Sequence, residues 1–254
     1  MIPRRWVSDL TSGINAISDK AHDALEQQIR AIDLTQDVAT VREKVVAVMQ
    51  GVCKVSTQGA AMLSTQFYDS VRQLEVGSPL GSAPDSGREP RATEGAVRAF
   101  AQKLVDGKQD EFVEACLQRA DYEIKTAAAQ ACLNNAKRDP LKPRFARVPD
   151  GEETCDFCLM LASRGFVYHT EAAASHTHSG CNCRVVPSWD DDGVEGYDEK
   201  SLYDQWQISV DARARERADR KGTDIDTECQ EIMDAYARSA KSVRAKAQLR
   251  KAKR

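Results

Sequence analysis

An apolar stripe with a helical period runs along the start of the chain and limits what this part can form. Large apolar residues and alanine recur every three or four positions, which is the spacing of one face of an α-helix. The members of the first stripe are Trp6, Leu10, Ile14, Ile17, Ala21, Leu25, Ile29 and Ile32. A second stripe starts at Val38 and continues toward Leu74. We therefore expect two or three long helices over residues 1–76.

The middle of the chain contains a break and then more helical pattern. Residues 77–94 have no period and are rich in Gly, Ser and Pro, which predicts a flexible linker. Helical spacing returns over residues 95–140, where Pro140 is expected to stop the last helix. Aromatic residues make up only 6% of the chain, which suits an Ala-rich helical protein better than a β-sandwich. The sequence predicts a mainly α protein that ends in C-terminal helices over residues 201–254.

Residues 141–200 differ from the rest and are expected to form a small α+β module. Three short strand-like runs, RFARVP, GFVYH and CRVVP, are bounded by Gly, Pro and Asp. The first and last of these runs are expected to pair as edges of a small sheet. Four of the eight cysteines and three of the four histidines lie within this module. The other cysteines in the helical part, Cys53, Cys116 and Cys132, are expected to be small core hydrophobes.

The cysteine and histidine spacing predicts a structural zinc site that stabilises the module. A C-x-x-C pair is followed by H-x-H-x-x-C-x-C, so two short knuckles can each present two ligands to one ion. Four of these six side chains complete a tetrahedron. The favoured set is Cys155, Cys158, His178 and Cys181, with Cys183 as the nearest substitute and His176 after it.

Catalytic interpretations of the same residues are less well supported. A redox C-x-x-C usually opens a helix within an alternating βαβ pattern, and no such pattern surrounds Cys155. A nucleophilic Cys–His pair would need one cysteine to stand out, and none does. The H-x-E at His169 has the wrong order relative to C-x-x-C for a zinc deaminase. No catalytic or cofactor-binding residue is assigned.

The C-terminal end carries the most uneven charge. Residues 235–254 hold eight Lys or Arg and no acid, although the whole chain has a formal net charge of −3. This tail is either a solvated helix end or an arm that contacts phosphates without reading sequence. No apolar run approaches the roughly 20 residues that span a bilayer, and the N-terminus lacks the apolar region of a signal peptide. We expect no membrane partner and a reducing cytoplasm.

The segment from Arg147 to Pro187 resembles the MuF-like minor head proteins of tailed bacteriophages, the family typified by the phage Mu F protein. The matching residues are Cys155 and Cys158, then Gly165, Phe166 and Tyr168, and finally His178, Cys181, Cys183 and Arg184. The whole is most similar to versions from phages of actinobacteria. It differs from the usual pattern at Ser179, Gly180 and Asn182.

The resemblance implies a structural virion component, linked to head morphogenesis and present in few copies near the portal. Such a minor capsid protein would contact the portal, the scaffold or the major capsid protein, and the tail would face packaged DNA. It would be found in the phage head, and in the bacterial host cytoplasm during assembly. Only two helices are expected to follow residue 200, which leaves no room for an added enzyme domain, so we expect no enzyme activity.

Two other functions stay open at this point. One is a zinc-binding regulator or nucleic-acid-binding protein, and the other is an effector enzyme injected with the DNA. A zinc module that reads DNA is expected to be basic around its ligands. Residues 150–200 contain eleven acidic residues and three basic ones, which argues against DNA contact by this module.

Overall fold

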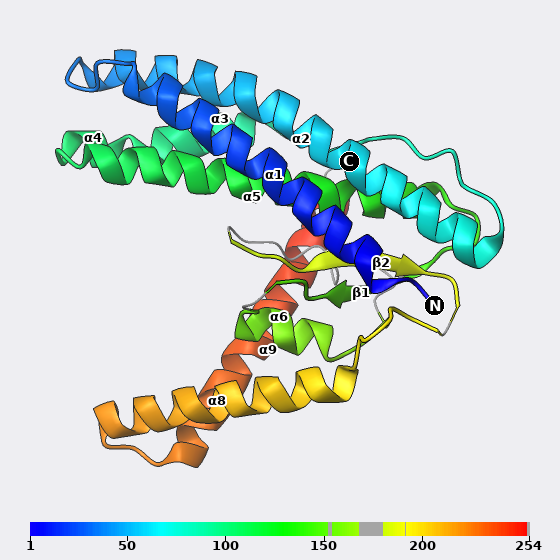
Figure 1. Cartoon of the computed structure of the whole chain (residues 1–254). Coiled ribbons are helices and arrows are strands. Elements are labelled where there is room, and N and C mark those ends of the chain that lie inside the picture. The colour runs from blue at the N-terminus through cyan, green and yellow to red at the C-terminus, as the bar shows by residue number, and fades with distance from the viewer. Residues whose placement is uncertain (152–153, 168–179, 191, 253–254) are drawn as a thin grey trace.

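The computed structural model describes residues 1–151, 154–167, 180–190 and 192–252, with side chains described up to residue 238. Its elements follow one another as α1 (Arg4–Arg30), α2 (Val38–Val76), α3 (Pro90–Phe100), α4 (Gln102–Val105), α5 (Gln109–Arg138), β1 (Arg144–Val148), α6 (Asp156–Ala162), β2 (Arg184–Ser188), α8 (Glu199–Lys221) and α9 (Ile225–Ala252). The mainly helical fold predicted from the sequence is confirmed (Figure 1).

The long helices α1, α2 and α5 pack together as a bundle, with α3 and α4 against it at one end (Figure 1). The predicted stripe of α1 is the face that packs into this bundle. Two glycines explain how α1 and α2 approach so closely. A Cβ at Gly13 would lie 2.9 Å from Leu63, and a Cβ at Gly59 would lie 3.3 Å from Ile17. At each of these two contacts, one helix has a glycine, and the branched side chain of the other helix occupies the space beside it.

Residues 77–89, within the range predicted as a flexible linker, contain no helix or strand but are held in place. Asp69 of α2 accepts hydrogen bonds from two backbone N–H groups of this segment, at 3.1 and 3.0 Å. Asn135 of α5 exchanges hydrogen bonds with the backbone of Ala83, at 3.0 and 3.1 Å. Helix α3 then starts at Pro90, inside the predicted linker. The segment thus fastens the C-terminal half of α2 to α5.

Strands β1 and β2 form a two-stranded antiparallel sheet, as predicted, with Ala146 opposite Val186. Nearly every residue of both strands is buried, because both faces of the sheet are covered. Side chains alternate between faces along a strand. Phe145 and Val185 pack in a core with α6 and α8, whereas Ala146 and Val186 pack in a core with α1 and α2. The sheet therefore separates the bundle from α6 (Figure 1).

The third strand-like run, GFVYH, is not a strand where the structure describes it. Residues 165–167 are irregular, and Tyr168 and His169 lie outside the described residues. Gly165 has φ of +67°, and a Cβ there would meet the carboxylate of Glu199. A turn at this glycine therefore replaces the regular extended backbone that the apolar pattern predicted.

Helices α8 and α9 form a C-terminal helical hairpin, joined through Gly222 with φ of +70°. Asp198 starts α8 by accepting hydrogen bonds from the backbone N–H groups of Lys200 and Ser201, at 2.9 and 3.2 Å. Helix α6 lies between this hairpin and the sheet (Figure 1). Within the described part of the chain, no helix has both the length and the apolar character needed to cross a bilayer.

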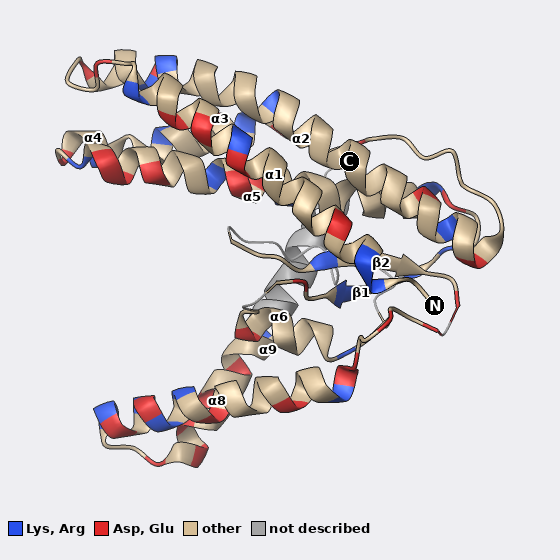
Figure 2. Cartoon of the chain, in the orientation of Figure 1, with Lys and Arg blue, Asp and Glu red and all other residues tan. Residues whose placement is uncertain are grey.

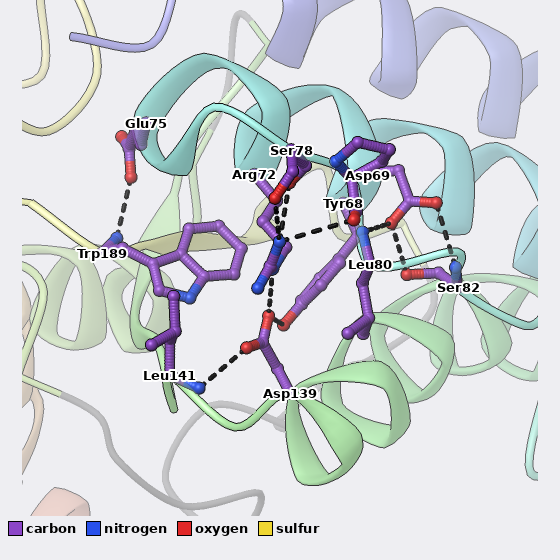
Figure 3. A network of polar contacts seen from close by, with 11 residues as sticks. Tyr68, Asp69, Arg72, Glu75, Ser78, Leu80, Ser82, Asp139, Leu141 and Trp189 are labelled. Carbon is purple, nitrogen blue, oxygen red and sulfur yellow. Dashed lines mark hydrogen bonds and ion pairs between the residues drawn. The ribbon is translucent and has the colours of Figure 1, made fainter.

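A buried ion pair joins the end of α2 to the end of α5 (Figure 3). One carboxylate oxygen of Asp139, which is fully buried, accepts hydrogen bonds from Arg72 Nε at 2.7 Å and from the Tyr68 hydroxyl at 3.1 Å. The other oxygen accepts the backbone N–H of Leu141 at 2.9 Å. Burial raises the pKa of Asp139, but the Arg72 guanidinium and the other donors outweigh it, so this pKa lies below its ordinary value.

Replacing the carboxylate, Asp139→Asn, is expected to lower the free energy of unfolding by about 3 kcal/mol at pH 7, because Arg72 loses its buried partner. Since the folded pKa is depressed, this stabilisation is present above the unfolded pKa of the carboxyl and is lost as pH falls through the folded pKa. Urea denaturation of parent and variant should therefore converge in acid.

The matched control is Asp204→Asn, which breaks the exposed Lys200–Asp204 pair on α8. Its effect should stay below about 1 kcal/mol. Equal losses for the two variants would show that burial of the Arg72–Asp139 pair carries no special weight.

Candidate metal centre

Three cysteine side chains meet in a small buried cluster, which we call the thiol cluster: Cys158, Cys181 and Cys183. Their sulfurs all lie within 4.8 Å of one another, and the Cys158 and Cys181 sulfurs are 3.5 Å apart. A tetrahedral zinc site with Zn–S bonds of about 2.3 Å has sulfurs about 3.8 Å apart. The spacing therefore fits three ligands of one ion. No disulfide joins cysteines in the described residues.

Cys181 and Cys183 reach the cluster because they lie two residues apart, directly before β2. The residues between and after them face the opposite way. Asn182 contacts Asn15 of α1 at 3.3 Å, and Arg184 donates to Thr11 of α1 at 3.1 Å. This alternation turns both thiols of C-x-C to one side.

Cys158 comes from the first turn of α6, and Cys155 caps that helix. The Cys155 sulfur accepts the backbone N–H of Cys158 at 3.4 Å, as an N-cap side chain does. Cys155 is exposed, whereas Cys158 is buried. Cys155 therefore sits at the outer edge of the thiol cluster, next to Cys158.

The structure brings together part of the predicted ligand set. Of the five predicted ligands, Cys158, Cys181 and Cys183 form the thiol cluster, and Cys155 adjoins it. Cys183, which the spacing placed only as a substitute, is a full member. His178 and the further candidate His176 lie outside the described residues.

A buried arginine that the sequence analysis missed supplies positive charge to the thiol cluster. Arg147 of β1 is 1% exposed, and its Nη2 lies 3.4 Å from the Cys181 sulfur. Burial lowers the pKa of Arg147, but the neighbouring thiols outweigh it, and the pKa lies above its ordinary value. A signal for this residue was present in the sequence, since Arg147 follows Phe145 by two residues in the strand run RFARV and so shares the face of that apolar side chain.

The pKa values of Cys158 and Cys181 differ because the thiols of the cluster hydrogen-bond to one another. Hydrogen bonds from Cys158 and Cys183, helped by the Arg147 charge, hold the pKa of Cys181 well below its ordinary value although burial opposes this. Hydrogen bonds to Cys155, Cys181 and Cys183, together with burial, raise the pKa of Cys158. Of the three thiols, Cys181 therefore has the surroundings that most favour the thiolate, which is the form that binds metal.

A second residue that the sequence analysis missed, Asp121 of α5, holds the backbone of Gly180, directly before Cys181. Its Oδ2 accepts the backbone N–H of Gly180 at 2.7 Å, and its Oδ1 accepts the Ser18 hydroxyl at 2.6 Å. Lys125 lies 3.1 Å from the same Oδ1. No local sequence pattern marks this role, because the contact spans 59 residues.

The matching family model is described as VG15 protein, and it covers residues 1–209. The chain belongs to the VG15 family. The matched range includes the bundle, the sheet and all members of the thiol cluster.

Curated relatives of this VG15 family protein come from phages of mycobacteria, as the predicted likeness to actinobacterial phages leads one to expect. It is 27% identical over 192 residues to the Gene 15 protein of Mycobacterium phage D29, covering 60% of this chain and 68% of the relative. It is also 27% identical over 191 residues to the Gene 15 protein of Mycobacterium phage L5, covering 55% of this chain and 62% of the relative. No solved structure matches.

A substitution in the thiol cluster should remove bound metal without a general loss of folding. Cys158→Ala is expected to lower zinc from about one ion per chain to near none, because it removes a central ligand. Metal content is measured by mass spectrometry on gel-filtered, reduced protein.

The control is Cys132→Ala, which shortens an equally buried cysteine in the core that lies outside the cluster. It should keep the zinc of the parent. A parent protein without zinc, or equal loss in both variants, would contradict the metal centre.

Proposed function

We propose that this VG15 family protein is a structural, non-enzymatic component of the phage head, acting near the portal in head assembly, DNA packaging or ejection. The mycobacteriophage relatives support a phage role, and the resemblance to MuF-like minor head proteins supports the head. The observation that carries the proposal is the thiol cluster. Its three thiols are buried, and a fourth protein ligand would close the site as in structural zinc sites, whereas a catalytic site keeps the fourth position open.

We propose zinc as the metal, held by the thiol cluster with Cys155 as the fourth ligand. Zn²⁺ with four thiolates carries a charge of −2. Basic residues lie on both strands of the sheet (Figure 2). Two of their guanidiniums are buried, that of Arg147 on β1 and that of Arg184 on β2, and they would offset this charge. The Cys155 sulfur supports this choice because it accepts the backbone N–H of Cys158 and so lies beside the thiol cluster.

The fourth ligand can be assigned with cobalt in place of zinc, because sulfur ligation gives cobalt a strong charge-transfer absorption. Cys155→Ser is expected to weaken metal binding about 10-fold or more and to reduce that absorption. His178→Ala should leave both unchanged. The reverse pattern would assign the position to histidine and restore the ligand set favoured by spacing.

The proposed partners are the portal, scaffold or major capsid proteins, with packaged DNA at the basic tail. The tail lies at the end of α9, and it supplies the eight cations of residues 235–254. Binding through phosphates would be independent of sequence and would weaken steeply with added salt. The proposed location is the phage head, and the host cytoplasm during assembly.

The head assignment is tested in phage particles. Mass spectrometry of purified virions is expected to find the protein in few copies per particle. A phage carrying Cys158→Ala should yield fewer filled heads than a phage carrying Cys132→Ala, since only the first loses the site. Absence of the protein from complete virions, with normal heads in both mutants, would contradict a structural role.

A further inference from the structure

The thiol cluster lies between the bundle and the C-terminal hairpin, beside an apolar core that includes residues of α2, α5, α6, α8 and α9. Cys181 and Cys183 lie on the segment before β2, against the bundle. Cys158 lies on α6, against the C-terminal hairpin. An ion bound by all three would therefore bridge the segment before β2, on the bundle side, and α6, on the hairpin side.

The bundle side of this bridge is fixed by polar contacts to α1 and α5. Asp121 holds the backbone of Gly180 at 2.7 Å. Arg184 reaches two residues of α1, Thr11 at 3.1 Å and Asn15 at 3.3 Å. These contacts are largely buried, so the segment carrying Cys181 and Cys183 moves with the bundle.

The hairpin side is fixed through Asp156, the residue between Cys155 and Phe157. Its carboxylate accepts hydrogen bonds from Ser209 and Arg213 of α8. Tyr236 of α9 completes the group, with its hydroxyl 2.7 Å from Arg213 and 3.3 Å from Asp156. The ring of Tyr236 also lies 6.1 Å from that of Phe157. One turn of α6 thus carries both a cluster thiol and the main polar anchor of the hairpin.

We propose that metal in the thiol cluster acts as a clamp that fixes the C-terminal hairpin to the bundle, an inference that rests on the proposed zinc site. Without metal, the cluster contributes hydrogen bonds of its thiols, and the hairpin is held by the Asp156 contacts and by the apolar core that it shares with α2, α5 and α6. With metal, strong metal–sulfur bonds join the two sides. Metal occupancy then governs how rigidly the molecule presents α9 and the basic tail at its end.

Hydrogen exchange on the full chain tests the clamp by comparing zinc-loaded and chelator-stripped protein, both reduced. Removal of zinc is expected to speed exchange about tenfold in α6, α8 and residues 225–238, and to leave α1 and α2 unchanged. Unchanged exchange in α8 would overturn the clamp, as would equal acceleration throughout the bundle.

A pair of variants on α8 separates the anchor from the metal. Arg213→Ala removes a partner of Asp156 and should speed exchange of the hairpin while zinc content stays at the parent value. Arg215→Ala, an exposed arginine two residues away, should change neither. If Arg213→Ala behaves like Arg215→Ala, Asp156 is not the anchor and the clamp is overturned.

Metal content in the same samples distinguishes failure of the clamp from failure of the metal centre. Zinc bound by the parent with no effect of its removal on α8 overturns the clamp and leaves the metal centre standing. A parent that binds no zinc overturns both.

Discussion

The alternation of side chains along β2 and the residues leading into it determines which parts of the molecule meet. Cys181 and Cys183 turn toward the thiol cluster, while Asn182 and Arg184 turn toward α1. A shift of the strand by one residue would exchange the two sets and place polar side chains where the thiols gather. The thiol cluster and the docking of α1 are thus two results of one strand register, and neither can change without the other.

Buried positive charge sets the chemistry at two places in the protein. At the end of α2, Arg72 meets the carboxylate of Asp139, an anion at any ordinary pH. At the thiol cluster, Arg147 meets Cys181, whose negative charge depends on its surroundings. An uncompensated buried charge costs several kcal/mol. The arginine therefore favours the thiolate form of Cys181. A cluster of thiolates in turn favours a bound cation. The Arg147–Cys181 contact and the spacing of the three sulfurs thus both support a metal site.

Much of the fold could be predicted because it follows from local periods. The stripes of α1 and α2 and the pairing of RFARVP with CRVVP are visible within short windows, and the structure confirms them. The position of Asp121, and of Cys183 inside the cluster, depends on contacts between distant segments, which no window contains. The run GFVYH shows that a strand-like apolar pattern does not always predict a strand. Gly165 has a positive φ, so the backbone turns there.

The family model covers the thiol cluster and does not cover the basic tail. The VG15 family model ends at residue 209, on α8, where Ser209 contacts Asp156. Everything that forms the thiol cluster, and the first contact between α6 and the hairpin, lies inside this range. Arg213, α9 and the basic tail lie beyond it. The thiol cluster therefore lies in the part of the chain that the family model matches, whereas the helix that carries the tail lies outside that part.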